Sequence, residues 1–169
     1  MKIPPLIVTL KIDEKSFELF DRLRRRHFPP ERNFLAAHQT LFHHLPGESL
    51  EDIRFELIEF CKNRKVFSLE FDNWRLLGKG VAVKIDSKEL INLRAHLADI
   101  WKDWLTAQDR QKFQPHITVQ NKVAPDEAKK LYENLARGWK TFDGNAEGLQ
   151  LWHYLGGDWK LEEEFLFVR

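Results

Sequence analysis

The chain has 169 residues, 43% of them hydrophobic, and its 27 Lys and Arg residues nearly balance its 26 Asp and Glu residues. This length predicts one domain with a real core, and the formal net charge of +1 argues against a protein that coats long nucleic acid, because such proteins carry a basic excess. Cys61 is the only cysteine, so we expect no internal disulfide. The N-terminal apolar run is too short for a signal peptide, and no run approaches the roughly 18 apolar residues that span a membrane. We therefore expect a cytoplasmic protein without a membrane partner.

Short strands alternate with helices along the predicted chain. Strands are expected at 6–12, 36–42, 66–71, 81–85 and 115–121, followed by a hairpin of the runs 148–155 and 159–168 joined by Gly156-Gly157. Helices are expected from Asp13 to the Pro29-Pro30 pair, from Ser49 through Phe60, from Ser87 through Trp104 and from Pro125 to about Arg137. Ser49, with Asp52 three residues later, resembles a capping box at the start of the second helix.

An internal repeat divides the sequence into two similar parts. The segments VTLKIDEK (8–15) and VAVKIDSK (81–88) share five of eight positions, and His38-Gln39-Thr40 recurs 78 residues later as His116-Ile117-Thr118. Trp74-x-x-Leu77-Gly78 recurs at the same separation. Chance similarity between apolar strands is the alternative. The simplest explanation is a duplicated α+β unit, spanning roughly 6–78 and 80–168, in a single domain (1–169) of two pseudo-symmetric lobes with a cleft between them.

The two His-x-Thr motifs carry the candidate chemistry. Residues i and i+2 of a strand share a face, so His38 and Thr40 project together, as do His116 and Thr118. Near neutral pH one imidazole can accept a proton while another donates one to a leaving oxygen. Threonine hydroxyls can donate hydrogen bonds to non-bridging phosphoryl oxygens. Two such pairs therefore favour acid–base chemistry at a phosphorus atom.

The sequences AAHQTLFHHLPG and KFQPHITVQNKV resemble the two signature motifs of the 2H phosphoesterase superfamily, which includes 2′-5′ RNA ligase-like proteins and cyclic nucleotide phosphodiesterases. The resemblance implies an α+β fold of two duplicated lobes, with antiparallel sheets lining a central cleft and helices outside. It also implies that His38, Thr40, His116 and Thr118 are catalytic. Where better-known relatives continue the first motif as Leu-x-Phe-Leu-Gly, this chain has Leu41-Phe42-His43-His44-Leu45-Pro46-Gly47.

Other residues near the motifs are candidates for substrate binding. Arg32 and Arg110 each precede a motif histidine by six residues and could contact phosphate from the rim of the cleft, although both could equally be solvated loop residues. The remaining candidates are Phe42, for which core packing is the favoured alternative to stacking on a base, and His44, Gln120 and Tyr154. Strand alternation places His43 on the face opposite His38, and no Asp, Glu or Cys cluster completes a metal site, so we expect neither a metal nor a cofactor.

The sequence thus predicts a monomeric, metal-independent phosphoric diester hydrolase. Its expected substrate is an RNA terminus or nucleotide with a 2′,3′-cyclic phosphate, or a 2′-5′ phosphodiester. Which histidine is the acid and which the base stays open. Two alternatives remain: a module that binds an RNA end or nucleotide without turning it over, and a weak 2′-5′ RNA ligase using the same site in reverse.

Overall fold

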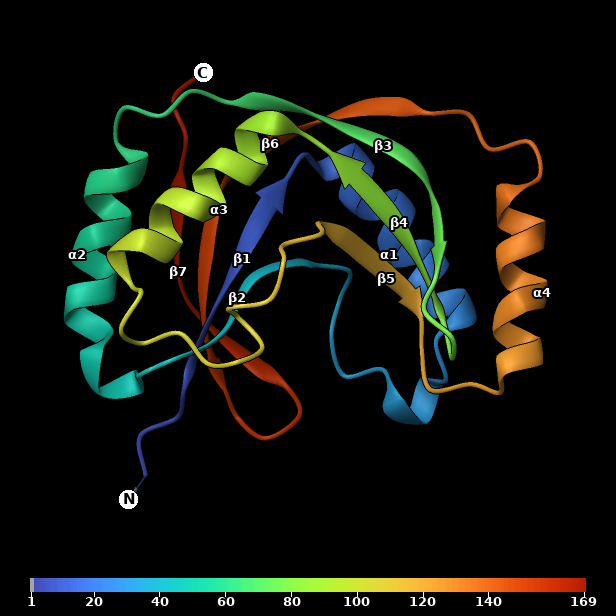
Figure 1. The fold of residues 1–169 in the computed structure, drawn as a ribbon, viewed down its shortest axis with the longest axis horizontal. Coiled ribbons are helices and arrows are strands. Elements are labelled where there is room, and N and C mark those ends of the chain that lie inside the picture. The colour runs from blue at the N-terminus through green and yellow to red at the C-terminus, as the bar shows by residue number, and fades with distance from the viewer. Residues whose placement is uncertain (1) are drawn as a thin grey trace.

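A curved seven-stranded sheet forms the centre of the computed structural model, which describes residues 2–169. Its strands are β1 (Leu6–Ile12), β2 (Gln39–Leu45), β3 (Phe67–Leu76), β4 (Val81–Asp86), β5 (His116–Gln120), β6 (Phe142–Tyr154) and β7 (Trp159–Leu166). The helices are α1 (Glu14–His27), α2 (Leu50–Cys61), α3 (Lys88–Ile100) and α4 (Pro125–Ala136), with short 3₁₀ helices at Pro30–Arg32 and Gly47–Ser49. Figure 1 shows the helices on the outside of the curved sheet. No helix within residues 2–169 has the length and apolar character of a membrane span.

The predicted α+β class and the order of the elements are confirmed, with differences in extent. Strand β2 begins at Gln39 rather than at residue 36, and α3 ends at Ile100, before Trp104. Strands β3 and β6 are longer than their apolar runs indicate, because pairing with β4 and with β3 respectively extends them into polar sequence. Backbone hydrogen bonding, which hydrophobic periodicity does not record, sets these boundaries.

Side-chain caps start two of the helices, though not the one that resembled a capping box. Asp13 accepts a hydrogen bond from the Ser16 backbone N–H at the start of α1, and Ser87 accepts one from the Leu90 N–H at the start of α3. Ser49 occupies the cap position of α2 but makes no side-chain hydrogen bond there, because the preceding 3₁₀ helix already places its backbone outside the usual extended cap conformation.

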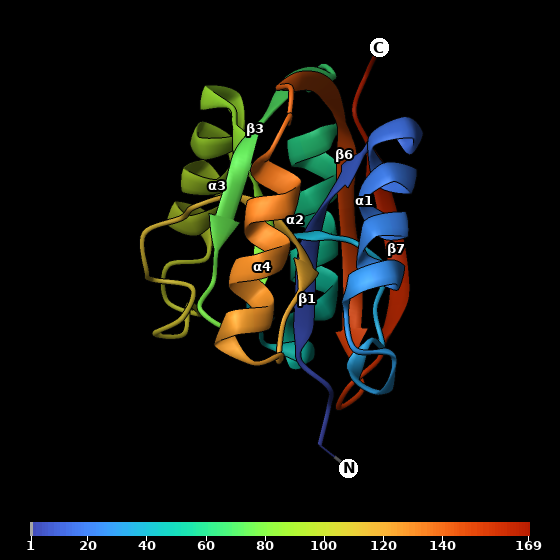
Figure 2. The same ribbon diagram turned by 90° about the vertical axis from the view of Figure 1, so that its right-hand side faces the viewer.

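The sheet is built from two similar groups of strands. The order is β2-β1-β6-β3-β4-β5, with neighbouring strands antiparallel throughout, and β7 pairs with β6 in the same sense. The groups β2-β1-β6 and β5-β4-β3 have matching connectivity, and each contains one strand from the other part of the chain. Two helices also pack on strands of the other part: α1 packs on β5, and α4 packs on β3 as well as on β4 of its own part (Figures 1 and 2). The sequence boundaries proposed for the repeat stay a prediction.

Two glycines at matching positions of the proposed repeat make tight turns. Gly78 has φ 82° between β3 and β4, and Gly156 has φ 100° between β6 and β7. In each turn a backbone N–H, of Leu77 or Leu155, donates to a carbonyl three residues later. Positive φ favours glycine, so the same local requirement explains the glycine in both parts of the chain.

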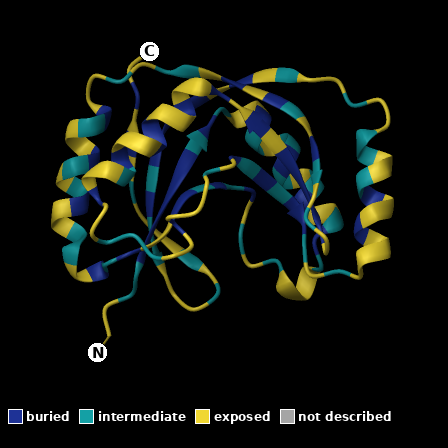
Figure 3. Cartoon of the chain, in the orientation of Figure 1, coloured by how far each residue is buried: buried dark blue, intermediate teal, exposed yellow. Residues whose placement is uncertain are grey.

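Aromatic side chains pack where α1 meets the sheet. Phe20 lies against Phe71 with ring centroids 4.8 Å apart, and Trp74, Trp139 and Phe142 surround this pair. Figure 3 shows buried strands at the centre and exposed outer helix faces. This cluster fixes α1 on the sheet and thereby places the polar groups of α1 near β5.

Two buried arginines join the helices to the strands that carry the His-x-Thr motifs. Arg24 of α1 is 5% exposed and donates to the Thr118 carbonyl of β5 at 2.9 Å. Arg94 of α3 is 7% exposed and donates to the Leu41 carbonyl of β2 at 2.9 Å. Burial lowers the pKa of Arg24 to about 10, which still leaves it charged at neutral pH, and burial lowers the pKa of Arg94 as well.

We expect Arg94→Met to destabilise the protein by roughly 2–4 kcal/mol, because it leaves buried carbonyls of Leu41 and Asp109 without their donors. Arg24→Met should cost a similar amount for the same reason. The measurement is urea-induced unfolding followed by circular dichroism. Arg137→Met, at an exposed position, is the matched control and should change stability by less than about 0.5 kcal/mol. Equal stability of Arg94→Met and Arg137→Met would contradict the structural role.

Candidate functional site

The two His-x-Thr motifs face one cavity of about 420 Å³. His38, which immediately precedes β2, and Thr40 line one wall, while His116 and Thr118 of β5 line another. The buried Gln39 side chain crosses between the two motifs and accepts a hydrogen bond from the His116 backbone N–H at 2.6 Å. The structure therefore brings together all four residues that were predicted to be catalytic.

The two motif histidines are held in the same way. His38 Nδ1 lies 2.7 Å from the Ala36 carbonyl, and His116 Nδ1 lies 2.8 Å from the Gln114 carbonyl. A carbonyl oxygen can only accept, so Nδ1 must carry the hydrogen in each ring. This assignment leaves Nε2 of each neutral ring as the nitrogen that can accept a proton.

Burial disfavours a charge on either motif histidine. It lowers the pKa of His38 to about 4, against the hydrogen bond to the Ala36 carbonyl, and the charges of Arg24, His116 and His43 act in the same direction as burial. The pKa of His116 is lowered too, mainly by burial and further by Arg75 and His43, although its bond to Gln114 opposes this. Both rings are therefore neutral at pH 7 before an anion binds.

His43 lines the same cavity, which corrects the expectation that it lies on the opposite face from His38. The pairing of β2 with β1 has two register shifts, one between Leu6 and Val8 and one between Val8 and Thr9. As a result the adjacent residues Leu41 and Phe42 are both buried, and strict alternation along β2 is broken.

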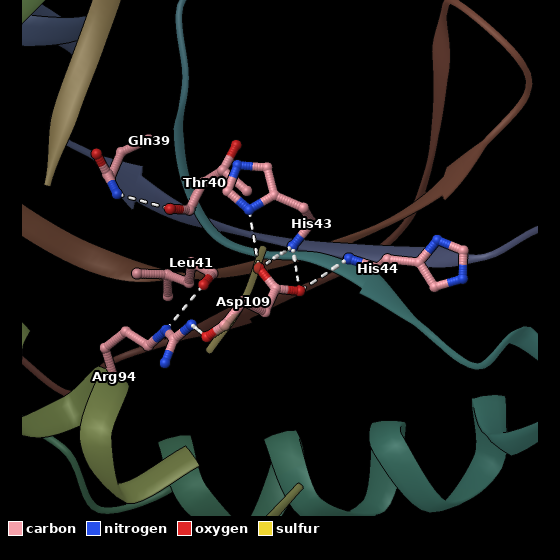
Figure 4. Close-up of polar contacts among 7 residues, drawn as sticks. All are labelled: Gln39, Thr40, Leu41, His43, His44, Arg94 and Asp109. Carbon is pink, nitrogen blue, oxygen red and sulfur yellow. Dashed lines mark hydrogen bonds and ion pairs between the residues drawn. The ribbon is translucent and has the colours of Figure 1, made fainter. Parts of the chain in front are cut away.

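A buried carboxylate holds His43 in place. Asp109 is 2% exposed, and its carboxylate accepts hydrogen bonds from His43 Nδ1 at 2.8 Å and from the backbone N–H groups of His43 and His44 (Figure 4). Burial acts to raise the pKa of Asp109, but these hydrogen bonds outweigh it and lower the pKa below its ordinary value. Arg94 donates to the Asp109 backbone carbonyl at 2.6 Å and fixes the loop that carries the carboxylate.

The two arginines predicted to bind phosphate lie outside the cavity lining of the described chain. Arg32 is exposed in the 3₁₀ helix Pro30–Arg32. Arg110 is exposed as well, and its guanidinium donates to the carbonyls of Leu105 and Lys102. Equal spacing from the two histidines did not place them at the cleft: Arg32 lies in an exposed 3₁₀ helix, and the Arg110 guanidinium binds backbone carbonyls of its own segment although the adjacent Asp109 and Gln111 line the cavity.

The other four candidate substrate contacts also lie elsewhere. Phe42 is fully buried against Trp101, with ring centroids 5.0 Å apart, and offers no face to a base. Gln120 is 3% exposed at the end of β5 and does not line the cavity within the described residues. His44 and Tyr154 line a different groove, and Figure 4 shows the His44 ring pointing away from Asp109.

A second hollow of about 580 Å³ adjoins the histidine cavity. His38, Gln39 and Trp159 line both. The His38 and Trp159 rings lie 4.7 Å apart, and Phe34 and Trp152 add aromatic surface to the second hollow. We call this second hollow the aromatic compartment. It offers flat apolar faces directly beside one motif histidine.

Sequence reasoning missed Asp109, Arg75, Lys112 and Trp159, which also line the histidine cavity. A signal was available for Asp109, since it directly precedes Arg110, which the repeat singled out. Arg75 and Trp159 come from strands remote from the motifs, and only the folded sheet brings them close. Within residues 2–169, no group of three or more His, Cys, Asp or Glu residues is arranged to hold a metal ion.

Comparisons with known proteins found a matching family model and solved structures with the same fold. The model of the 2′-5′ RNA ligase superfamily matches residues 12–158. The crystal structure of TT0787 of Thermus thermophilus superposes with a TM-score of 0.69 at 14% identity, covering 96% of this chain and 97% of that one. The structure of E. coli LigT complexed with 3′-AMP superposes with a TM-score of 0.62 at 16% identity, covering 98% and 99%. No curated protein matches the sequence significantly.

We expect His38 and His116 to titrate below pH 6.5, His38 near pH 4, because burial opposes the charged ring. Long-range ¹H–¹⁵N NMR spectra of the ring nitrogens will show both the titration and the hydrogen on Nδ1. Added inorganic phosphate should raise both midpoints, since a bound anion stabilises imidazolium. His38→Asn and His116→Asn variants assign the signals. A midpoint at or above pH 7 in phosphate-free buffer would contradict the geometry.

Proposed function

Because this chain belongs to the 2′-5′ RNA ligase superfamily, whose members act on phosphoesters, we propose that it hydrolyses 2′,3′-cyclic phosphates or 2′-5′ phosphodiesters of nucleotides and RNA ends. The observation that carries the proposal is the single cavity lined by His38, Thr40, His116 and Thr118. Each His-x-Thr pair comes from a different part of the chain, and the two imidazoles and two hydroxyls line the same small cavity. This set suffices for proton transfer on both sides of one phosphorus atom.

We assign the general base to His38 and the general acid to His116 for hydrolysis. The pKa of His38 is lowered to about 4, which favours a neutral ring whose Nε2 accepts the proton of the attacking water. As the water oxygen bonds to phosphorus, the ester bond to the leaving 2′ or 3′ oxygen breaks. That oxygen takes its proton from Nε2 of protonated His116. The Thr40 and Thr118 hydroxyls donate to the non-bridging oxygens, where negative charge increases in the transition state.

The aromatic compartment supports a nucleoside as the rest of the substrate. Trp159 lies against His38, so a base stacked on its ring would place the ribose close to the histidine cavity. Structures of E. coli LigT complexed with 3′-AMP, ATP and NADP⁺ provide fold-level support for a nucleotide ligand. Ligation is the reverse of the same step and needs the same two imidazoles in exchanged protonation states. A module that binds without turnover is the remaining alternative.

We expect His38→Ala and His116→Ala each to lower kcat/KM for 2′,3′-cyclic AMP by about 10²–10⁴-fold, because each removes one proton-transfer group. The assay measures product formation by chromatography in the presence of a chelator. His96→Ala is the matched control, since His96 is exposed and packs against Phe60 outside the cavity. Tight nucleotide binding without turnover by the unchanged protein would favour the binding module, and turnover lost on chelation would contradict metal-independent hydrolysis.

We also expect an acidic pH optimum for kcat/KM. The acid must be protonated, and because the pKa of His116 is lowered below 6.5, kcat/KM should fall as the pH rises through that lowered pKa. The base must be neutral, so activity should be lost only as the pH falls toward the His38 pKa of about 4. The check is a profile of kcat/KM against pH, which reports the free protein. A value still increasing above pH 7 would overturn the assignment.

A further inference from the structure

Arg75 and Lys112 give the histidine cavity uncompensated positive charge. Both line the cavity, Arg75 from β3 and Lys112 from the loop between α3 and β5. Within residues 2–169 neither side chain lies within 4.0 Å of a carboxylate oxygen. Their charges are therefore free to meet an anion.

The other charged groups of the cavity are already engaged. Arg94 donates to two backbone carbonyls and lies over the Phe42 ring at 4.2 Å, and the Asp109 carboxylate is occupied by His43 and two backbone N–H groups. Arg94 and Asp109 also cancel in net charge. Counting only its Arg, Lys and Asp side chains, the cavity lining therefore carries an excess of two positive charges, from Arg75 and Lys112.

His43 adds a donor or acceptor beside them. Its Nδ1 is bound to Asp109, which leaves Nε2 free, and its side chain is 45% exposed. The charge of His43 acts on both His38 and His116, so its ring lies near the reaction centre as well as in the cavity wall. Gln108 and Gln111 of the Lys112 loop line the same wall with amide groups.

A single reacting phosphodiester does not use all of this charge. A 2′,3′-cyclic phosphate carries one negative charge, and the two threonine hydroxyls and the protonated histidine already serve its oxygens in the proposed reaction. Among residues 2–169, Lys11 is the one Lys or Arg that lines the aromatic compartment, and it pairs with Glu164 at 2.9 Å. Positive charge is thus concentrated on one side of the reaction centre.

We propose that His43, Arg75 and Lys112 form a subsite for a second, non-reacting phosphate of the substrate. The preferred substrate is then a nucleotide that carries another phosphate, such as a 5′-phosphorylated nucleoside cyclic phosphate or the end of an oligonucleotide. This inference rests on the proposed function for the identity of the reacting phosphate, but the subsite itself is a matter of binding. It can therefore be tested without turnover.

The test compares adenosine 3′-monophosphate with adenosine 3′,5′-bisphosphate by isothermal titration calorimetry on the full chain. We expect the bisphosphate to bind at least about tenfold more tightly, because it adds charge-assisted hydrogen bonds inside a cleft. The preference should shrink as NaCl is raised from 50 to 500 mM, since salt screens these partly exposed charges. Equal affinities, or no binding of the bisphosphate at millimolar concentration, would overturn the subsite.

Three single variants identify the residues that produce the preference. Arg75→Gln and Lys112→Gln should each lower the bisphosphate-to-monophosphate ratio several-fold, and His43→Asn should lower it less. Lys129→Gln, at an exposed position on α4, removes the same charge away from the cavity and should leave the ratio unchanged. Circular dichroism and unfolding curves verify that each variant is folded. A ratio unaffected by Arg75→Gln and Lys112→Gln would show that the cations serve the reacting phosphate or the fold.

Turnover separates this inference from the proposed function. The same variants are assayed with adenosine 2′,3′-cyclic phosphate with and without a 5′-phosphate. Hydrolysis of both substrates at equal kcat/KM, together with equal affinities, would leave the phosphoesterase function standing and remove the subsite. Preferential binding of the bisphosphate without hydrolysis of either substrate would retain the subsite and remove the hydrolase.

Discussion

Two buried guanidinium groups determine where the motif strands lie relative to each other. Arg24, from the first part of the chain, donates to the Thr118 carbonyl in the second part, and Arg94, from the second part, donates to Leu41 in the first. Burying a charge is costly, and here carbonyl acceptors and the faces of Phe28 and Phe42 offset the cost. Each motif strand is held both by pairing with a strand of its own part and by an arginine of the other part. The distance between the two imidazoles is therefore a property of the whole domain.

The two motifs are alike in sequence but differ in what their middle residues do. Gln39 reaches across and accepts a hydrogen bond from the His116 backbone, whereas Ile117 at the matching position is buried in the core. The tryptophans of the proposed repeat differ as well: Trp74 packs in the core, and Trp152 lines the aromatic compartment. A sheet with matching halves therefore encloses a cleft with distinct ends. Such a cleft can bind an asymmetric ligand, such as a nucleotide, in one orientation.

Sequence alone predicted what depends on local pattern and missed what depends on contacts between distant segments. The helices, the strands and the four His-x-Thr residues follow from periodicity, caps and repetition. The position of His43 could not be predicted, because register shifts in β2 depend on its pairing with β1. Arg110 was chosen by its spacing, yet the neighbouring Asp109 turns into the cavity, since Arg94 and the backbone of β2 provide its hydrogen-bond partners. Spacing identifies the loop, and packing decides which residue of the loop reaches the site.

The three imidazoles of the cavity differ in the acceptor that binds Nδ1: a backbone carbonyl for His38 and for His116, and the Asp109 carboxylate for His43. A neutral carbonyl orients His38 and His116 without adding a charge that would fix their protonation state, so both rings can exchange a proton during a reaction. The ionised Asp109 carboxylate orients His43 through its Nδ1. A proton-transfer group has to change charge within each cycle, while an anion-binding group has to keep its donor in place. These acceptors are consistent with the proposed roles, in which the two motif histidines transfer protons and His43 belongs to the proposed anion subsite.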